Sequence, residues 1–193
     1  MHDSLQLTDQ EILSGLSDIH NSPIDNGTIE LIVIRPDSNE RSVLSQCRLS
    51  PEGGTEGDAW ARGCWKKLDD GSPHPDVQIC ITNSRMMRLL AGSKENWPPA
   101  GDNLFVDLNL SRDVLTAGQL LQVGDCILEI TETSHNGCGK FAERYGDAAL
   151  RVVNSEIGKH HRLRGVYARV VRAGVISVGD RIHRISKKAP LHS

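Results

Sequence analysis

The chain has 193 residues, enough for one domain, and its 38% hydrophobic and 4% aromatic content indicates a soluble globular protein with an aliphatic core. A net charge of -3 and a pI near 6.2 argue against a general nucleic-acid-binding protein. The sequence contains no apolar run of about 18 residues, so no membrane-spanning helix is expected. The polar N-terminus lacks the pattern of a signal peptide. Five cysteines without a C-x-x-C pair favour reduced thiols in a cytoplasmic protein over a disulfide framework.

The N-terminal part predicts a short helix followed by two strands. Thr8 and Glu11 have the spacing of a capping box, which predicts a helix over about residues 9–18. Alternating apolar residues predict a strand over residues 27–36, and residues 41–50 form a second one after a loop typical of a hairpin.

Residues 50–63 form a glycine-rich stretch, which predicts an ordered loop without regular elements. Its carboxylates (Glu52, Glu56 and Asp58) are suited to a cation, and its backbone amides to an anion. The simpler interpretation is a tight turn in which Asp58 accepts hydrogen bonds from backbone amides. The sequence leaves both interpretations open.

The remaining elements are mostly short strands separated by glycine turns. Apolar patterns predict strands near residues 76–82 and 103–110, and a helix after Asn83 that ends at Gly92. Two further strands surround a Gly-Asp turn at residue 124. Two more are expected near the C-terminus, joined by "RAGVISVGD". Together these elements predict a mainly β protein, a closed or nearly closed barrel with a few peripheral short helices.

Cys138 is the first candidate for chemistry. It lies between two glycines at a predicted helix start, where unpaired backbone N–H groups favour a thiolate. His135 and Lys140 add nearby donor or positive character, and His135 is a candidate to tune the thiol. The spacing alone leaves open a reactive or metal-binding thiol and a packed, inert one.

The other four cysteines look structural. Cys47, Cys80 and Cys126 lie within apolar strand patterns, which predicts that they fill the core. Cys64 stands between two tryptophans, where partial exposure is expected.

Three arginines form the next candidate group. In an extended strand Arg162 and Arg164 share one face and Arg169 lies on the other. Side chains that point into a barrel mouth would suit a ligand with phosphate or carboxylate groups. Side chains that point outward would be ordinary surface charge, and the sequence does not decide between the two.

Residues 137–182, "GCGKFAERYGDAALRVV" and then "RLRGVYARVVRAGVISVGDRI", resemble the MOSC domain, named after the C-terminal domain of molybdenum cofactor sulfurase. "EGGTEGDAW" resembles the glycine loop of this family, and residues 100–131 resemble its Arg-Arg-Asn strand and the next barrel turn. The resemblance divides the chain into a helical extension (1–29), a MOSC-like barrel (30–185) and a basic tail (186–193).

The resemblance implies a MOSC-type β-barrel with a cysteine at its functional mouth. Family members are linked to molybdenum cofactor, to sulfur transfer from a persulfide, or to reduction of N-hydroxylated compounds. Cys138 would then be the molybdenum ligand or the sulfur carrier. The residues expected to shape the mouth or hold the cofactor and its phosphate are Asn103, Gly54, Asp58, His135, Arg162, Arg164 and Arg169.

One departure from the family pattern matters. Gly101 and Asp102 stand where many relatives have two arginines, so this turn lacks a residue that grips the cofactor. The chain also carries no recognisable iron–sulfur, flavin or aminotransferase-like domain, so a separate protein would have to supply electrons or sulfur.

Two other functions remain open. One is a barrel that binds a small molecule or a partner without chemistry, in which Cys138 is buried. The other is a cysteine-dependent transferase or lyase that needs no metal.

Overall fold

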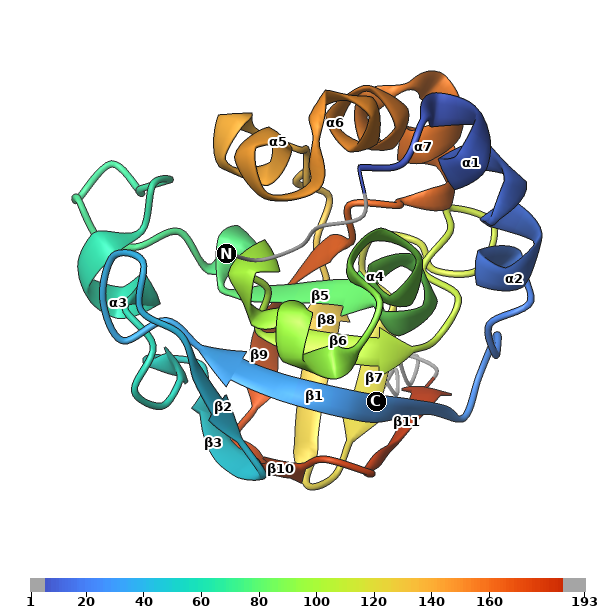
Figure 1. Cartoon of the computed structure of the whole chain (residues 1–193). Helices are drawn as coiled ribbons and strands as arrows, with labels where there is room; N and C mark the ends of the chain where they lie inside the picture. Colours follow the sequence, from blue (N-terminus) through green and yellow to red (C-terminus); the bar gives the residue numbers. More distant parts are fainter. Residues whose placement is uncertain (1–5, 186–193) are drawn as a thin grey trace.

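A computed structural model describes residues 6–185 and contains a closed barrel of seven strands (Figure 1). Around the barrel the order is β11-β7-β8-β9-β5-β6-β1, and β1 closes it against β11. Only β5 and β6 run parallel; the other neighbours are antiparallel. The seven strands are β1 (Gly27–Ile34), β5 (Ile79–Asn83), β6 (Leu104–Asp107), β7 (Leu120–Val123), β8 (Cys126–Ile130), β9 (Val166–Arg172) and β11 (Arg181–Ile185). The predicted mainly β fold is therefore confirmed.

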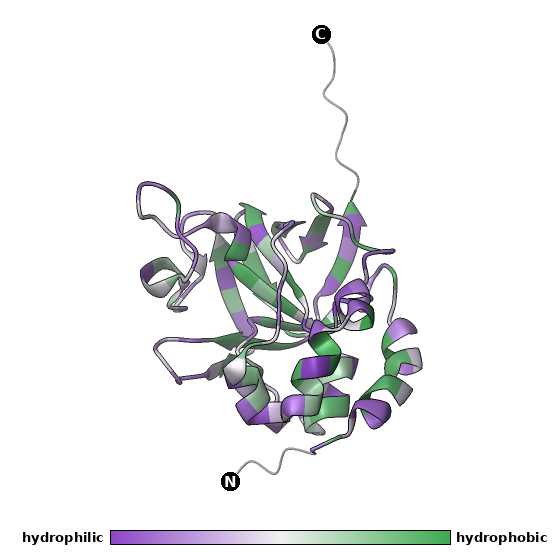
Figure 2. Cartoon of the chain, turned by 90° about the horizontal axis from the view of Figure 1, so that it is seen from above, coloured by the Kyte–Doolittle hydropathy of each residue, from purple (hydrophilic) through white to green (hydrophobic). Residues whose placement is uncertain are grey.

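The barrel forms because apolar residues alternate along its strands (Figure 2). In β5, Ile79 and Ile81 are buried in the barrel interior, whereas Cys80 lies on the opposite, outer face among different neighbours. In β9, Val166, Ala168 and Val170 likewise join the interior. The outer faces of the same strands remain available to other layers of the structure, including the floor of a cavity.

A second, three-stranded sheet lies beside the barrel and corrects several expectations. The segment expected as one strand over residues 41–50 is two strands in different sheets. The glycine-rich segment expected to lack regular elements contains β4 and α3, and a third C-terminal strand, β10, occupies the expected connection. These elements are β2 (Ser42–Leu44), β3 (Gln46–Ser50), β4 (Gly54–Thr55), β10 (Gly174–Ser177) and α3 (Trp60–Gly63).

Six more α-helices cover part of the barrel, and several lie together above it (Figure 1). All of them except α7 contribute apolar side chains to a second hydrophobic core, which they share with the outer side of β1 and β6. They are α1 (Asp9–Ser14), α2 (Leu16–His20), α4 (Ser84–Ala91), α5 (Gly139–Tyr145), α6 (Asp147–Asn154) and α7 (Glu156–His161). Short 3₁₀ turns occur at Pro75–Val77, Lys94–Asn96 and Pro98–Ala100. No helix in the described part of the chain is long and apolar enough to span a bilayer.

The N-terminal helix prediction is partly correct. Thr8 and Glu11 form the expected capping box. The helix, however, is interrupted at Gly15, which separates α1 from α2. A Cβ atom at Gly15 would lie 2.6 Å from Leu89 of α4, so the break coincides with a close approach between the two segments.

At the C-terminal end, two arginines are part of the barrel. Arg181 and Arg184 lie in β11, and Arg181 donates hydrogen bonds to Asn26 and Thr28. Because β1 already pairs with β11 at Gly27, the first barrel strand begins before residue 30. The expected basic tail, 186–193, lies outside the described residues.

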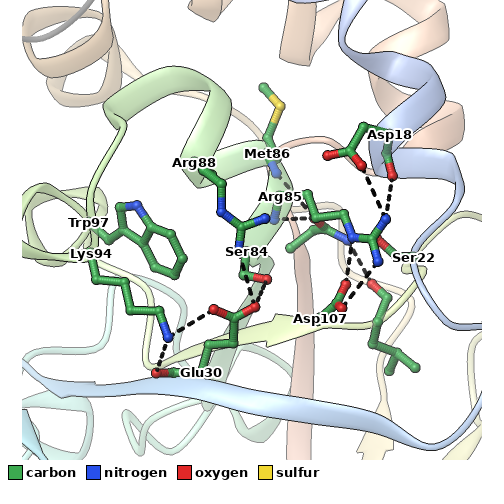
Figure 3. Close-up of polar contacts among 12 residues, drawn as sticks. Asp18, Ser22, Glu30, Ser84, Arg85, Met86, Arg88, Lys94, Trp97 and Asp107 are labelled. Atoms are coloured by element: carbon green, nitrogen blue, oxygen red, sulfur yellow. Dashed lines mark hydrogen bonds and ion pairs between the residues drawn. The ribbon is translucent and has the colours of Figure 1, made fainter.

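Hydrogen bonds and ion pairs connect α2 and α4 to the barrel (Figure 3). Arg85 of α4 donates to both carboxylate oxygens of Asp107 in β6, at 2.8 and 3.2 Å, and to the carbonyl and carboxylate of Asp18 in α2. Glu30 of β1 pairs with Lys94 at 2.9 Å and with the more exposed Arg88. Arg85 therefore joins three elements, whereas Arg88 makes one peripheral contact.

We expect Arg85→Met to lower the free energy of unfolding by about 1.5–3 kcal/mol, because it removes charge-assisted hydrogen bonds and leaves the partly buried Asp107 unpaired. Arg88→Met is the matched control and is expected to change stability by no more than about 0.5 kcal/mol. Urea unfolding of both variants checks this. Equal losses in the two variants would show that Arg85 has no special role in joining the helices to the barrel.

Candidate functional site

A cavity of about 440 Å³ opens on the side of the barrel where α3 and α5 lie (Figure 1). Its walls come from segments far apart in the sequence: the end of β1 and the loop after it, the α3 segment, β5, the turn before β6, the start of α5, and β9 with the residues before it. The charged and chemically active side chains on its walls are Arg35, Asp37, Arg41, Asp58, Cys64, Cys80, His135, Lys140, Arg164 and Tyr167.

The floor is built on the outer face of two barrel strands. Cys80 of β5 and Tyr167 of β9 are directly paired across the strands, and both side chains point away from the barrel interior. The ring of His135 lies against Tyr167 with a centroid separation of 4.3 Å. Burial, and then the charges of Arg164 and Arg35, hold the pKa of His135 well below its usual range, so the imidazole is neutral.

One wall depends on a buried ion pair between Arg35 and Asp58. The Arg35 guanidinium donates to both carboxylate oxygens of Asp58, at 2.9 and 3.0 Å, and to the Asn103 side-chain oxygen at 3.2 Å. Asp58 also accepts the backbone N–H groups of Arg35 and Trp60. Asp58 therefore caps backbone amides, as the simpler interpretation of this loop predicts, and also holds an arginine at the cavity.

A second ion pair, between Arg164 and Asp102, also lies at the cavity. Arg164 donates from one nitrogen to both oxygens of Asp102 at 2.8 Å, and from the other to the Ala100 carbonyl. Both side chains are almost fully buried. The guanidinium also lies over the Phe141 ring at 5.0 Å. Arg164 is thus fixed by α5 and by the turn before β6.

The mouth of the cavity carries positive charge that no described carboxylate pairs directly. Burial, followed by the nearby charges of Arg144 and Arg35, lowers the pKa of Arg41, which is the expected result of crowding cations. The buried Nε of Arg41 has no hydrogen-bond partner. A Cβ atom at Gly101 would lie 3.4 Å from Arg41, and Gly101 has a φ of 83°, so this turn needs a glycine.

Cys138 is the N-cap residue of α5, and its side chain makes no capping hydrogen bond. It is exposed, whereas the other four cysteines are buried. It lies between His135 and Lys140 in sequence, both of which line the cavity, although its own side chain does not. The thiol is therefore accessible beside the rim of the cavity.

The structure brings together only part of the predicted site. Asp58, His135 and Arg164 line the cavity, and Asn103 lies beneath it, bonded to Arg35 and to the Cys80 amide. The carboxylates of the glycine-rich loop do not converge, because Asp58 is buried against Arg35 while the other two are exposed.

Three predicted residues lie away from the cavity. Arg162 is not in a strand: it is the C-cap of α7 with a φ of 50°, and it donates to the carbonyls of Leu110 and Leu115. Arg169, in β9, pairs with Glu129 and Asp76. Gly54 is buried in β4 beneath Trp60 and Gln78.

Sequence reasoning missed Arg35, Arg41 and Cys80. The period-two pattern of β5 could have identified Cys80, because two isoleucines that face the interior force the residue between them outward. Cys64, expected to be partly exposed, is buried and donates to the Lys66 carbonyl. Cys47 and Cys126 do fill the barrel core, where burial raises the pKa of each thiol, to about 11 and about 12.

Comparisons with known proteins agree with this architecture. Three solved structures are similar over most of the chain. YiiM from Geobacillus stearothermophilus has a TM-score of 0.58 at 16% identity, covering 85% of this chain and 77% of that one. YiiM from Escherichia coli has a TM-score of 0.54 at 17% identity, covering 84% and 71%, and the YUAD protein from Bacillus subtilis has 0.54 at 20%, covering 83% and 97%. At these identities the likeness shows the fold alone.

No curated protein matches the sequence. The family model of the MOSC domain, however, matches residues 72–183, which is more than half of the chain and includes β5 to β9, α5 and Cys138. The chain therefore belongs to the MOSC domain family.

Proposed function

We propose that this protein binds molybdenum cofactor at the cavity, with Cys138 as the thiolate ligand of the metal. The observation that carries the proposal is the surplus of positive charge at the mouth. Arg35 and Arg164 are each matched by a buried carboxylate. Arg41 and Lys140 add two more cations at the cavity, and only one further carboxylate, Asp37, lines it, so positive charge remains in excess. An anionic ligand relieves this repulsion.

The residues present fit a cofactor that carries a phosphate and a soft metal. Arg41 offers an unpartnered buried Nε, and Lys140 lines the same cavity, so both suit the phosphate. The exposed thiol of Cys138 suits the metal end, because soft metals favour sulfur ligands. The bound cofactor would supply a redox-active metal, while this chain holds the phosphate and orients the metal through Cys138.

A second candidate is sulfur carriage, which the exposure of Cys138 favours. In this reaction the Cys138 thiolate attacks the outer sulfur of a donor persulfide. A new S–S bond forms at Cys138, the old one breaks, and the donor leaves as a thiolate. The donor would be a separate protein in the cytoplasm, where free thiols persist.

The properties of Cys138 also distinguish the two remaining functions, a binding barrel without chemistry and a metal-free enzyme. A binding barrel without chemistry predicts a buried Cys138, and the exposed side chain argues against it. A metal-free transferase or lyase predicts an activity that chelators leave intact and that Cys138→Ala abolishes.

The main test uses protein purified from cells that make molybdenum cofactor. We expect the wild type to contain molybdenum by elemental analysis and Cys138→Ser to lose it. Cys47→Ser, a change in the barrel core, is the control and should keep it. If molybdenum is absent from the wild type, or if Cys138→Ser changes neither metal nor persulfide content, the proposed function is wrong.

Arg41→Gln should lower cofactor occupancy about tenfold or more, because one charge-assisted hydrogen bond contributes about 1.5–3 kcal/mol. Arg169→Gln is the matched control: it removes an arginine that lies outside the cavity and should leave occupancy unchanged. The measurement is the amount of bound cofactor per folded protein molecule in each of the two variants. Equal losses would show that net charge matters and the position of Arg41 does not.

A further inference from the structure

Three side chains that the proposed cofactor site does not use come together at the floor of the cavity, where Cys80 and His135 line it and Asp102 is buried behind them. Cys80 comes from β5, Asp102 from the turn before β6, and His135 from the loop before α5. The Cys80 sulfur, a carboxylate oxygen of Asp102 and a ring nitrogen of His135 all lie within 4.8 Å of one another. Zinc binds such atoms at roughly 2.0–2.3 Å, which places the ligand atoms of a tetrahedral site roughly 3.3–3.8 Å apart.

His135 supplies an unsatisfied polar group in this cluster. Its side chain is only 6% exposed, and its Nδ1 lies 3.8 Å from Asp102 Oδ1, too far for a hydrogen bond. A buried polar atom without a partner costs free energy, which a bound ligand would recover. The ring is held neutral by burial and by the two arginines, which lower its pKa, so one ring nitrogen has a free lone pair.

The other two groups are also oriented in advance. The carboxylate of Asp102 is fixed by Arg164, which leaves lone pairs of both oxygens free. The stacking of His135 on Tyr167 fixes the ring plane. Outer partners of this kind orient metal ligands in proteins.

The charge balance restricts what the cluster accepts. The two ion pairs, Arg35 with Asp58 and Arg164 with Asp102, sum to zero. A divalent ion bound to the Cys80 thiolate adds one net positive charge (+2 and -1). Arg35 Nη1 lies 3.6 Å from the Cys80 sulfur and favours the thiolate form. The remaining positive charge favours an anionic fourth ligand, which the open cavity admits.

We propose that Cys80, Asp102 and His135 form a second metal site, which takes a divalent transition-metal ion of the zinc class. Sulfur and imidazole ligands select zinc, cobalt or iron over magnesium or calcium. Three protein ligands and a fourth position open to the cavity are typical of reactive metal sites, whereas structural zinc sites have four protein ligands. The site is independent of Cys138 and of molybdenum cofactor.

Cobalt(II) is the probe, because a cobalt–thiolate bond gives an absorption band in the near ultraviolet. Metal-stripped wild type is expected to bind one equivalent of Co²⁺ with this band, and zinc should displace it. Cys80→Ser should abolish the band, and Asp102→Asn should weaken Co²⁺ binding about tenfold or more, since the loss of even an outer partner weakens metal binding roughly 10–100-fold. Cys138→Ser and Cys64→Ser are the thiol controls and should keep band and affinity.

Thermal unfolding of each metal-free variant shows whether that variant is folded. If Cys80→Ser is unfolded, Asp102→Asn takes its place in the comparison with the wild type. The proposal is overturned if the wild type gives no thiolate band, or if the band survives in folded Cys80→Ser. It is also overturned if the band is lost in Cys138→Ser, because the metal would then be at the rim. If Cys138→Ser loses molybdenum but keeps the cobalt band, the two sites are independent of each other.

Discussion

The buried ion pair between Arg35 and Asp58 is the interaction on which the site depends. It joins the end of β1, the glycine-rich segment and, through Asn103, the turn before β6. A carboxylate as buried as Asp58 is stable only when it is paired and hydrogen-bonded, so its loop must stay beside the arginine. The pair thereby holds the loop against the barrel, where Trp60 packs in one cluster with Cys80 and Tyr167, and all of these residues line the cavity.

Arginines from other segments contact Gly101 and Asp102, the two positions at which the sequence resemblance leads one to expect arginines. The Gly101 carbonyl accepts from Arg35 at 3.1 Å, and Asp102 holds Arg164. Guanidinium groups therefore surround this turn, although none belongs to it. Arg41 adds a further cation beside this turn, where its guanidinium would be in van der Waals contact with a Cβ atom at Gly101.

The barrel was predictable because its strands carry the period-two pattern that any closed sheet with an apolar interior imposes. The site was less predictable, because its charged partners lie far apart in sequence: Arg35 meets Asp58 and Asn103 across the fold, and no local pattern pairs them. The prediction that Arg162 and Arg164 share one face of a strand was wrong. The backbone is left-handed at Arg162 and has a φ of 103° at Gly165, so the chain is not extended there and its side chains do not alternate.

Cys80 and Cys138 differ in burial, and this difference determines which chemistry each sulfur atom can perform. Burial raises the pKa of the Cys80 thiol, so this sulfur keeps its proton unless a cation replaces it, and a protonated thiol is a poor nucleophile. Cys138 is exposed at the start of α5, where a large partner can reach it. The proposed sulfur exchange with another protein is therefore suited to the exposed Cys138, whereas the buried Cys80 is suited to a small ion.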